Sequence, residues 1–254
     1  MGDLKELTKR IIVALDVGTK DEALSLVRQL EEAEIFKVGL RLFTAGGPIF
    51  LRKIQSLRKK IFLDLKFHDI PNTVAGAVKE GVRLGAHMIT LHASGGYEMM
   101  AAAADAATTE AERENTTKPL LLAVTVLTSL KGDQLKKIGM ESDTFNQVLR
   151  LASLAKKANI DGIVCSPQEI EIIRKELGNA HLIVAPGIRP SWAAAQDQKR
   201  IMTPSLAFEK GADYLVIGRP IITATSPQKA FHRIKEELDR SVHSSNSSHK
   251  ENSP

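Results

Sequence analysis

The sequence predicts an α/β fold, a (β/α)8 TIM barrel formed by a single domain. Three observations predict it: eight short apolar segments recur along the chain, helical stretches separate them, and the chain has 254 residues. Strands that alternate with helices form βαβ units and a parallel sheet, and eight such units in about 250 residues are typical of a closed barrel. A doubly wound open sheet is the alternative. It usually follows its first strand with G-x-G-x-x-G, whereas this chain has DVGTKDEA there.

A strand is expected wherever a run of β-branched and other apolar residues lies between polar stretches. The first four are IIVALDV (11–17), IFKVGL (35–40), IFLDLKF (61–67) and HMITLHA (87–93). The last four are LLLAVTVL (120–127), DGIVCS (161–166), HLIVAPGI (181–188) and DYLVIGRP (213–220). Between them lie helical stretches such as KDEALSLVRQLEEA (20–33) and FNQVLRLASLAKKA (145–158).

One domain is expected over residues 10–240, because no linker or composition shift divides them. Residues 1–9 form an N-terminal lead-in. The tail SVHSSNSSHKENSP (241–254) is rich in Ser and Asn, and it is predicted to be disordered.

Composition narrows the class of protein. The formal net charge is +5, but the basic residues are spread over many helices and aromatic residues make up only 4%. A mildly basic enzyme with an anionic small substrate fits this better than a nucleic-acid-binding protein. No apolar run is long enough to span a bilayer, and the charged N-terminus is unlike a signal peptide. The single cysteine, Cys165, fits a reducing cytoplasm, and its apolar surroundings predict a buried, inert thiol.

Polar residues gather where the strands end, which is where barrels carry their chemistry. Charged or polar candidates occur at the ends of strands 1 to 5: Asp16, Lys37, Asp64, Lys66, Asp69, His92, Thr128 and Ser129. Asp16 and Lys37 alone could form a structural ion pair, because buried charges are rare unless paired or functional. Three or more charges that converge on one end of the barrel favour a functional site. No HxxxH or CxxC occurs, so the evidence for a metal site is weak.

The segment FLDLKFHDIPNT (62–73) carries the strongest signal. Side chains alternate along a strand, so Phe62, Asp64, Lys66 and His68 are expected on one face. A strand that aims a carboxylate and an ammonium inward needs a chemical reason. His68 is expected to have a hydrogen-bonded supporting role, and His87 and His92 are expected to be satisfied core or rim residues.

The ends of strands 7 and 8 predict a phosphate site, because barrels often bind phosphate with the loops that follow these strands. PGIRP supplies Arg189, and IGRP supplies Gly218 and Arg219. An arginine gives charge-assisted hydrogen bonds, and a glycine permits close backbone approach. The stretch 191–211 begins with a long loop that we expect to act as a lid, from which Gln198 reaches the phosphate.

These motifs together resemble the orotidine 5′-phosphate decarboxylase family, in its bacterial, monofunctional form. DLKFHDIPNTV matches the family signature D-x-K-x-x-D-I-P-N-T. ALD (14–16), FKVG (36–39), LTS (127–129), DQKR (197–200) and the two arginine motifs support it. The resemblance covers about residues 10–235 and leaves no room for a fused phosphoribosyltransferase.

The resemblance implies the role of each site residue. Lys66 donates the proton to C6 of the pyrimidine, and Asp64 lies beside the substrate carboxylate. Asp69, Ile70 and Thr73 reach the site of the partner in a homodimer. The remaining substrate contacts are Asp16 and Lys37 at the ribose, Thr128 and Ser129 near the base, and Arg189, Gln198, Gly218 and Arg219 at the 5′-phosphate. The family needs no metal or organic cofactor, and its substrate is orotidine 5′-monophosphate.

Two alternatives stay open at this stage. Related barrels share the D-x-K-x-x-D arrangement but decarboxylate or condense sugar phosphates through a Mg²⁺-stabilised enediolate. HDIPNT and LTS argue against them. A barrel that binds a phosphate ligand without catalysis would not need a buried lysine flanked by acids.

Overall fold

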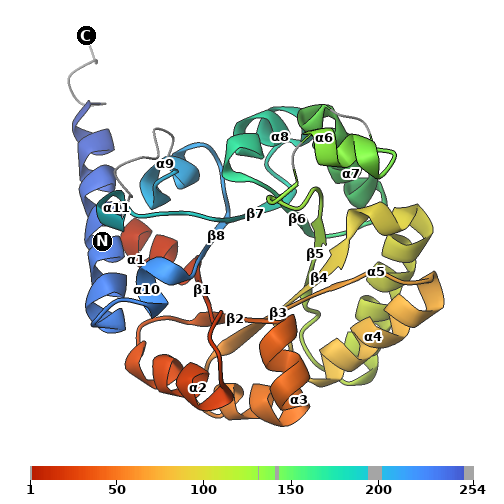
Figure 1. Ribbon diagram of the computed structural model, residues 1–254, viewed down its shortest axis with the longest axis horizontal. Coiled ribbons are helices and arrows are strands. Elements are labelled where there is room, and N and C mark those ends of the chain that lie inside the picture. Colours follow the sequence, from red (N-terminus) through yellow and green to blue (C-terminus); the bar gives the residue numbers. More distant parts are fainter. Residues whose placement is uncertain (1, 131, 141–142, 194–201, 249–254) are drawn as a thin grey trace.

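The computed structural model describes residues 2–130, 132–140, 143–193 and 202–248 of the 254-residue chain. In these residues the parallel strands close into a barrel in the order in which they occur along the chain (Figure 1). The strands are β1 (Ile11–Ala14), β2 (Ile35–Gly39), β3 (Lys60–Phe67), β4 (Met88–His92), β5 (Leu120–Val124), β6 (Gly162–Val164), β7 (Leu182–Pro186) and β8 (Tyr214–Ile217). The predicted (β/α)8 barrel is confirmed.

Helices surround the ring of strands (Figure 1). The α-helices are α1 (Gly2–Lys9), α2 (Lys20–Gln29), α3 (Leu40–Gln55), α4 (Pro71–Arg83), α5 (Gly96–Arg113), α6 (Gly132–Lys137), α7 (Thr144–Lys157), α8 (Ile170–Leu177), α9 (Pro204–Glu209), α10 (Arg219–Ile222) and α11 (Pro227–Ser248). Three short 3₁₀ helices are η1 (Ala93–Gly95), η2 (Pro167–Glu169) and η3 (Ser191–Ala193). In the described part of the chain no helix is both long and apolar enough to cross a membrane.

Alternation along the strands separates two apolar cores. The larger lies between the strands and the helices, and the smaller fills the barrel interior. The smaller core consists of Ile12, Ala14, Ile35, Phe62, Met88, Leu122, Val184 and Val216. Both faces of each strand are therefore covered, as a parallel sheet requires.

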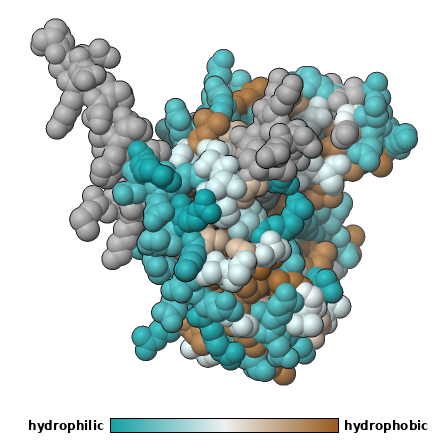
Figure 2. Space-filling model, turned by 60° about the vertical axis from the view of Figure 1, so that its left-hand side comes forward, coloured by the Kyte–Doolittle hydropathy of each residue, from teal (hydrophilic) through white to brown (hydrophobic). Residues whose placement is uncertain are grey.

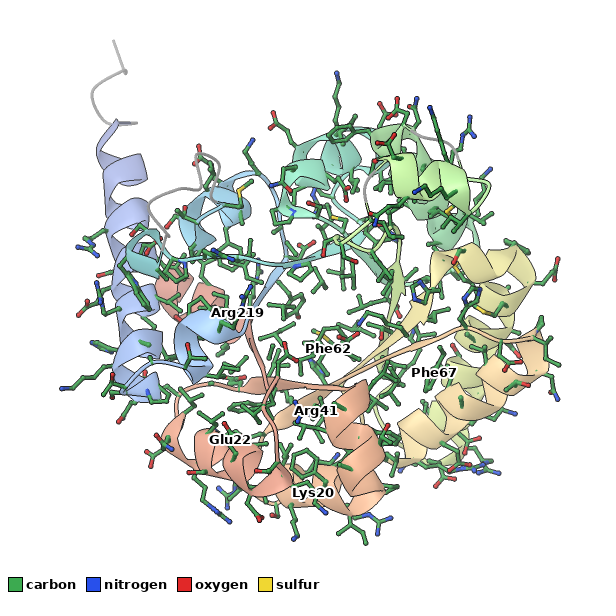
Figure 3. The ribbon with its side chains drawn as sticks, in the orientation of Figure 1. Lys20, Glu22, Arg41, Phe62, Phe67 and Arg219 are labelled. Carbon is green, nitrogen blue, oxygen red and sulfur yellow. The ribbon has the colours of Figure 1, made fainter. Side chains whose placement is uncertain are left out.

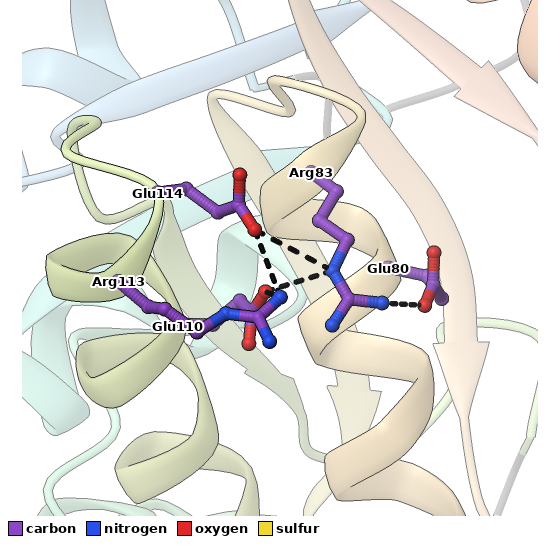
Figure 4. Close-up of polar contacts among 5 residues, drawn as sticks. All are labelled: Glu80, Arg83, Glu110, Arg113 and Glu114. Carbon is purple, nitrogen blue, oxygen red and sulfur yellow. Dashed lines mark hydrogen bonds and ion pairs between the residues drawn. The ribbon is translucent and has the colours of Figure 1, made fainter.

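The outer helical surface is polar. On the face shown in Figure 2, hydrophilic residues predominate and hydrophobic ones lie between them. Helices α4 and α5 pack on each other and share a charged cluster in which Arg83 contacts Glu80, Glu110 and Glu114 (Figure 4). Arg113 also contacts Glu110, which is 2% exposed. A buried carboxylate with two guanidinium partners avoids the cost of an unpaired buried charge.

Helix α11 continues beyond the boundary predicted for the disordered tail. The tail was expected to begin at residue 241, but the helical backbone extends to Ser248. Ser and Asn disfavour helices only weakly, and the preceding amphipathic segment already supplies a formed helix to extend. Propagation adds one hydrogen bond per residue without a new nucleus. Helix α11 packs against α1, α9 and α10 at the side of the barrel shown on the left of Figure 1.

Candidate active site

A cavity of about 700 Å³ opens at the carboxyl ends of the strands. Its floor is the upper layer of the barrel interior: Ala14, Phe62, Val124, Val164 and Val216. Figure 3 shows Phe62 inside the ring of strands, Arg219 at its edge, where it begins α10, and Phe67 outside the ring. The apolar floor, with charged residues around it, suits a small ligand that has an apolar ring and anionic groups.

A row of alternating charges forms one wall of this cavity. Lys37 Nζ lies 3.0 Å from Asp16 Oδ1 and 3.3 Å from Asp64 Oδ2. Lys66 Nζ lies 2.7 Å from Asp64 Oδ1. The Asp64 side chain is 11% exposed and that of Asp16 is 60% exposed, so the row extends from the buried interior to solvent. Asp16 and Lys37 therefore belong to a larger cluster and are not an isolated structural pair.

The backbone of β3 is distorted where it carries Lys66. In the pairing of β3 with β4, Leu63 is opposite Ile89 and Phe67 is opposite Leu91, so β3 has two extra residues there. Lys66 has a φ of +51°, which is uncommon for a residue with a side chain. Bulges of this kind re-aim side chains beside active sites. Here the bulge leaves Asp64 and Lys66 on the cavity wall.

Thr90 of β4 holds this distortion in place. Its hydroxyl accepts a hydrogen bond from the Lys66 backbone N–H (2.9 Å) and donates one to Asp64 Oδ1 (3.0 Å). Thr90 is fully buried. This residue was not predicted from the sequence, because a threonine inside an apolar strand is an ordinary β-former. One hydroxyl thus connects the backbone of the lysine to the carboxylate that contacts its ammonium.

The charges of the row favour an ionised Asp64. Burial opposes ionisation of this carboxyl, but Lys37, Lys66 and the hydrogen bonds from Lys66 and Thr90 outweigh it and hold its pKa below the ordinary value. His92, at the end of β4, lies near the row. Burial lowers the pKa of His92, and the nearby His68 and Lys66 lower it further. A neutral His92 adds no positive charge beside Lys66.

A second wall of the cavity, at the ends of β7 and β8, carries the predicted phosphate site. Arg189, Gly218 and Arg219 line the cavity, as does Gly187 with a φ of +77°. Arg189 follows the end of β7, between the buried residues Ile188 and Pro190, and it is only partly exposed. Two guanidinium groups at neighbouring strand ends can hold a phosphate dianion by charge-assisted hydrogen bonds.

Several predicted residues lie away from this cavity. Thr128 lines it, but Ser129 does not. Asp69, Ile70 and Thr73 are exposed and contribute to neither of the two cavities at the charged row. Asp69 Oδ1 accepts a hydrogen bond from its neighbour's backbone N–H, that of Ile70, at 2.7 Å. Gln198 lies outside the described residues. Among the described residues of one chain, Lys66 thus forms an ion pair with Asp64 and is not flanked by two aspartates.

Three other residues complete the surroundings. His68 is exposed and its ring lies 5.4 Å from that of His92, with no hydrogen bond to the charged row among its described contacts. Cys165 lines the cavity, yet it is 1% exposed, and burial raises the pKa of its thiol well above the ordinary value. This agrees with the predicted buried, inert thiol. Trp192 also lines the cavity and was missed in the sequence analysis.

Comparison with known proteins assigns this arrangement to a family. Residues 9–234 match the profile of the family described as "Orotidine 5'-phosphate decarboxylase / HUMPS family". A relative from Nostoc sp. (strain PCC 7120), named orotidine 5'-phosphate decarboxylase, is 47% identical over 230 residues, which are 90% of this chain and 97% of the relative. A relative of the same name from Geobacter sp. (strain M21) is 48% identical over 239 residues, covering 92% and 98% of the two chains.

Solved structures agree with these relatives. The crystal structure of orotidine 5'-phosphate decarboxylase from Lactobacillus acidophilus superposes with a TM-score of 0.80 at 36% identity, covering 91% of this chain and 99% of that chain. An uncharacterized conserved protein from Geobacillus kaustophilus gives a TM-score of 0.79 at 33% identity, with 90% and 99% covered. The similarity therefore spans the whole barrel, including both walls of the cavity.

Proposed function

The chain belongs to the orotidine 5′-phosphate decarboxylase / HUMPS family and is a carboxy-lyase, and we propose that it converts orotidine 5′-monophosphate to UMP and CO2 without a metal or cofactor. This reaction would place it in de novo pyrimidine biosynthesis. The observation that carries the proposal is the contact of Lys66 Nζ with Asp64 Oδ1 at 2.7 Å, in a cavity that two arginines also line. These groups in one cavity suit a nucleotide with its base at the lysine and its phosphate at the arginines.

The chemistry explains why β3 aims charge into the barrel. When the bond between C6 and the carboxylate breaks, CO2 leaves and the electron pair stays on C6. No electron sink is at hand in the pyrimidine ring, so the developing carbanion needs electrostatic stabilisation. The ammonium of Lys66 supplies it and then transfers one proton from Nζ to C6. The charges are already in place, so little reorganisation accompanies the reaction.

Asp64 contributes by repulsion, and the size of that contribution is limited. Two like charges about 4 Å apart repel by roughly 4 kcal/mol at an effective dielectric near 20. This corresponds to about three decades of rate, whereas enzymes commonly supply about 8–23 kcal/mol. Stabilisation of the carbanion by Lys66 must therefore carry the larger part. Asp64 also holds the Lys66 ammonium in place through their 2.7 Å ion pair.

The phosphate end supplies binding energy away from the reacting carbon. Arg189, Gly218 and Arg219 would hold the 5′-phosphate, and Asp16 and Lys37 the ribose hydroxyls. Binding energy from a remote group can support orientation at the reacting centre. The predicted contact of Gln198 with the phosphate remains a prediction.

We also propose a homodimer with shared active sites. The exposed Asp69, Ile70 and Thr73 support it, since they follow the catalytic strand yet line neither of the two cavities described at the charged row. A mixture of Asp69→Ala and Lys66→Ala subunits tests this. Recovery of activity after exchange of inactive subunits is expected, because some heterodimers regain one intact site. No recovery, with heterodimers shown to form, would contradict shared sites.

The activity itself is tested by following the ultraviolet absorbance of orotidine 5′-monophosphate with and without EDTA. Turnover that EDTA does not change is expected. Nucleotide binding without turnover would favour a non-catalytic binding barrel. Turnover of a sugar phosphate that EDTA abolishes would favour the Mg²⁺-dependent relatives instead.

A further inference from the structure

The turn that carries Arg189 is held from outside the barrel. The Ser191 backbone N–H donates to Glu237 Oε2 of α11 at 3.1 Å, and Ser191 Oγ donates to the same oxygen at 3.0 Å. Glu237 thus caps the first residue of η3 with a carboxylate, although it is 46 positions away in sequence. Such a bond between a charged acceptor and a backbone N–H is stronger than a neutral one.

A second contact joins the same two elements. The guanidinium carbon of Arg233 lies 4.4 Å from the ring centroid of Trp192, within the range of a cation–π interaction. Arg233 and Glu237 are four residues apart and therefore share one face of α11. That face contacts two consecutive residues of the turn, and Trp192 lines the cavity.

Helix α11 also contacts α9, and the segment before α9 bonds to the turn that carries Arg189. The Arg189 backbone N–H donates to the Met202 carbonyl at 3.1 Å, which joins the turn to the segment before α9. Ser205 of α9 donates from Oγ to the carbonyl of Glu237 at 3.5 Å. Pro190 has no N–H, so the backbone donors of residues 189 and 191 depend on Met202 and α11.

We propose that Glu237 and Arg233 of α11 are positioning residues that hold the turn 189–193 and thereby set the affinity of the site for the phosphate group of the ligand. This inference rests on the proposed function, because it takes Arg189 to bind phosphate. Neither residue lines the cavity, so both act through the turn. It assigns a functional role to the last helix, which carries none of the residues of the family motifs.

The chain offers a direct probe of this role. Trp192 is its only tryptophan and lies at the cavity, so intrinsic fluorescence reports ligand binding without a label. The binding of UMP and of uridine, which lacks the phosphate, is measured for the wild type, Glu237→Ala and Ser191→Ala. Glu236→Ala is the matched control, because it removes the same charge from the next position, where the carboxylate contacts only His232 among the described ion pairs.

Glu237→Ala is expected to weaken UMP about tenfold and uridine by less than twofold, since a hydrogen bond to a charged group is worth that much when it is lost. Ser191→Ala should change the ratio of the affinities for UMP and uridine by a smaller factor. In the Glu237→Ala background it should cause no further change in that ratio. In turnover, KM for the nucleotide rises while kcat at saturation changes little. Glu236→Ala should leave the ratio unchanged.

Other outcomes would overturn the inference. Equal weakening of UMP and uridine, or a lower melting temperature with an unchanged ratio, would show a structural role only. Ser191→Ala keeps the helix intact, so the same ratio can be read if Glu237→Ala fails to fold. A wild-type protein that binds UMP no more tightly than uridine would overturn the proposed function and this inference with it. If the wild type prefers UMP over uridine and the variants show the same preference, the inference alone would be overturned.

Discussion

Lys66 Nζ lies 2.7 Å from Asp64 Oδ1, while the backbone of Lys66 adopts a φ of +51°. The ion pair and the strained backbone both belong to the bulge in β3. This bulge contains two residues more than the segment of β4 that it pairs with. Strain of this kind costs about 1–3 kcal/mol and persists where the surroundings over-determine it. Around Lys66 the surroundings are Asp64, Thr90 and the cavity wall.

The first prediction ranks the two members of this pair. Lys66→Met keeps the unbranched stem but removes the charge and the proton donor, so kcat should fall at least about 10⁴-fold, the upper range for a general acid. Asp64→Asn removes the repulsion and should cost about 10²- to 10³-fold. Steady-state assays at saturating orotidine 5′-monophosphate measure both. UMP binding by tryptophan fluorescence controls for the integrity of the site, and a greater loss in Asp64→Asn would reverse the ranking.

The second prediction concerns Thr90. Thr90→Val keeps the shape but removes the hydroxyl that bonds the Lys66 N–H and the Asp64 carboxylate. Bonds that involve a charged group are worth about 1.5–3 kcal/mol, so kcat should fall roughly 10- to 100-fold. Thr90→Ser retains the hydroxyl and should stay within a few-fold of the wild type. Equal activity of the valine and serine variants would show that the bulge does not depend on this hydroxyl.

The strand ends and the barrel could be predicted because they depend on local patterns. Periodicity located every strand to within a few residues, and the topology of a barrel then brought Asp16, Lys37, Asp64 and Lys66 together. Thr90 could not be predicted in the same way. Its role arises only because the neighbouring strand bulges, and a bulge has no period-two signature in the sequence.

The outer parts of the site were harder to predict for a related reason. Asp69 belongs to the same short motif as Lys66, but the turn before α4 directs it away from the cavity of its own chain. Trp192 meets Arg233, and Ser191 meets Glu237, only because α11 packs beside the turn after β7. These contacts join elements that are far apart in sequence, so they depend on how α11 packs against the barrel.

The third prediction tests packing inside the barrel at Gly162 of β6. A Cβ at this position would lie 2.6 Å from both the Cβ and the carbonyl oxygen of Leu182, so the backbone of β7 would have to move. Gly162→Ala should therefore destabilise the protein by about 1–3 kcal/mol, the usual cost of overpacking. Denaturant unfolding measures it. Gly18→Ala is the control, because its nearest neighbours would be at 3.6 and 3.7 Å, and equal stabilities of the two variants would contradict the argument.

The fourth prediction concerns the pH dependence of stability. Burial raises the pKa of the Glu169 carboxyl to about 7, although this group accepts a hydrogen bond from the Ser166 N–H at 2.8 Å. An unfolded glutamate has a pKa of about 4.3, so the native state binds this proton more tightly than the unfolded state does. Stability therefore falls as the pH rises from about 4.3 to 7, by roughly 4 kcal/mol in total, and stays reduced above that range.

Glu169→Gln removes this titration but keeps a carbonyl oxygen that can accept the Ser166 bond. Relative to the wild type, the variant should gain stability progressively between about pH 4.3 and 7. Melting temperatures of both proteins across that range, at fixed ionic strength, give the difference curve. Because the rest of the titrating groups are shared, they cancel in the difference. A difference that does not change with pH would mean that the pKa of Glu169 is the same in the native and unfolded states, and that burial does not raise it.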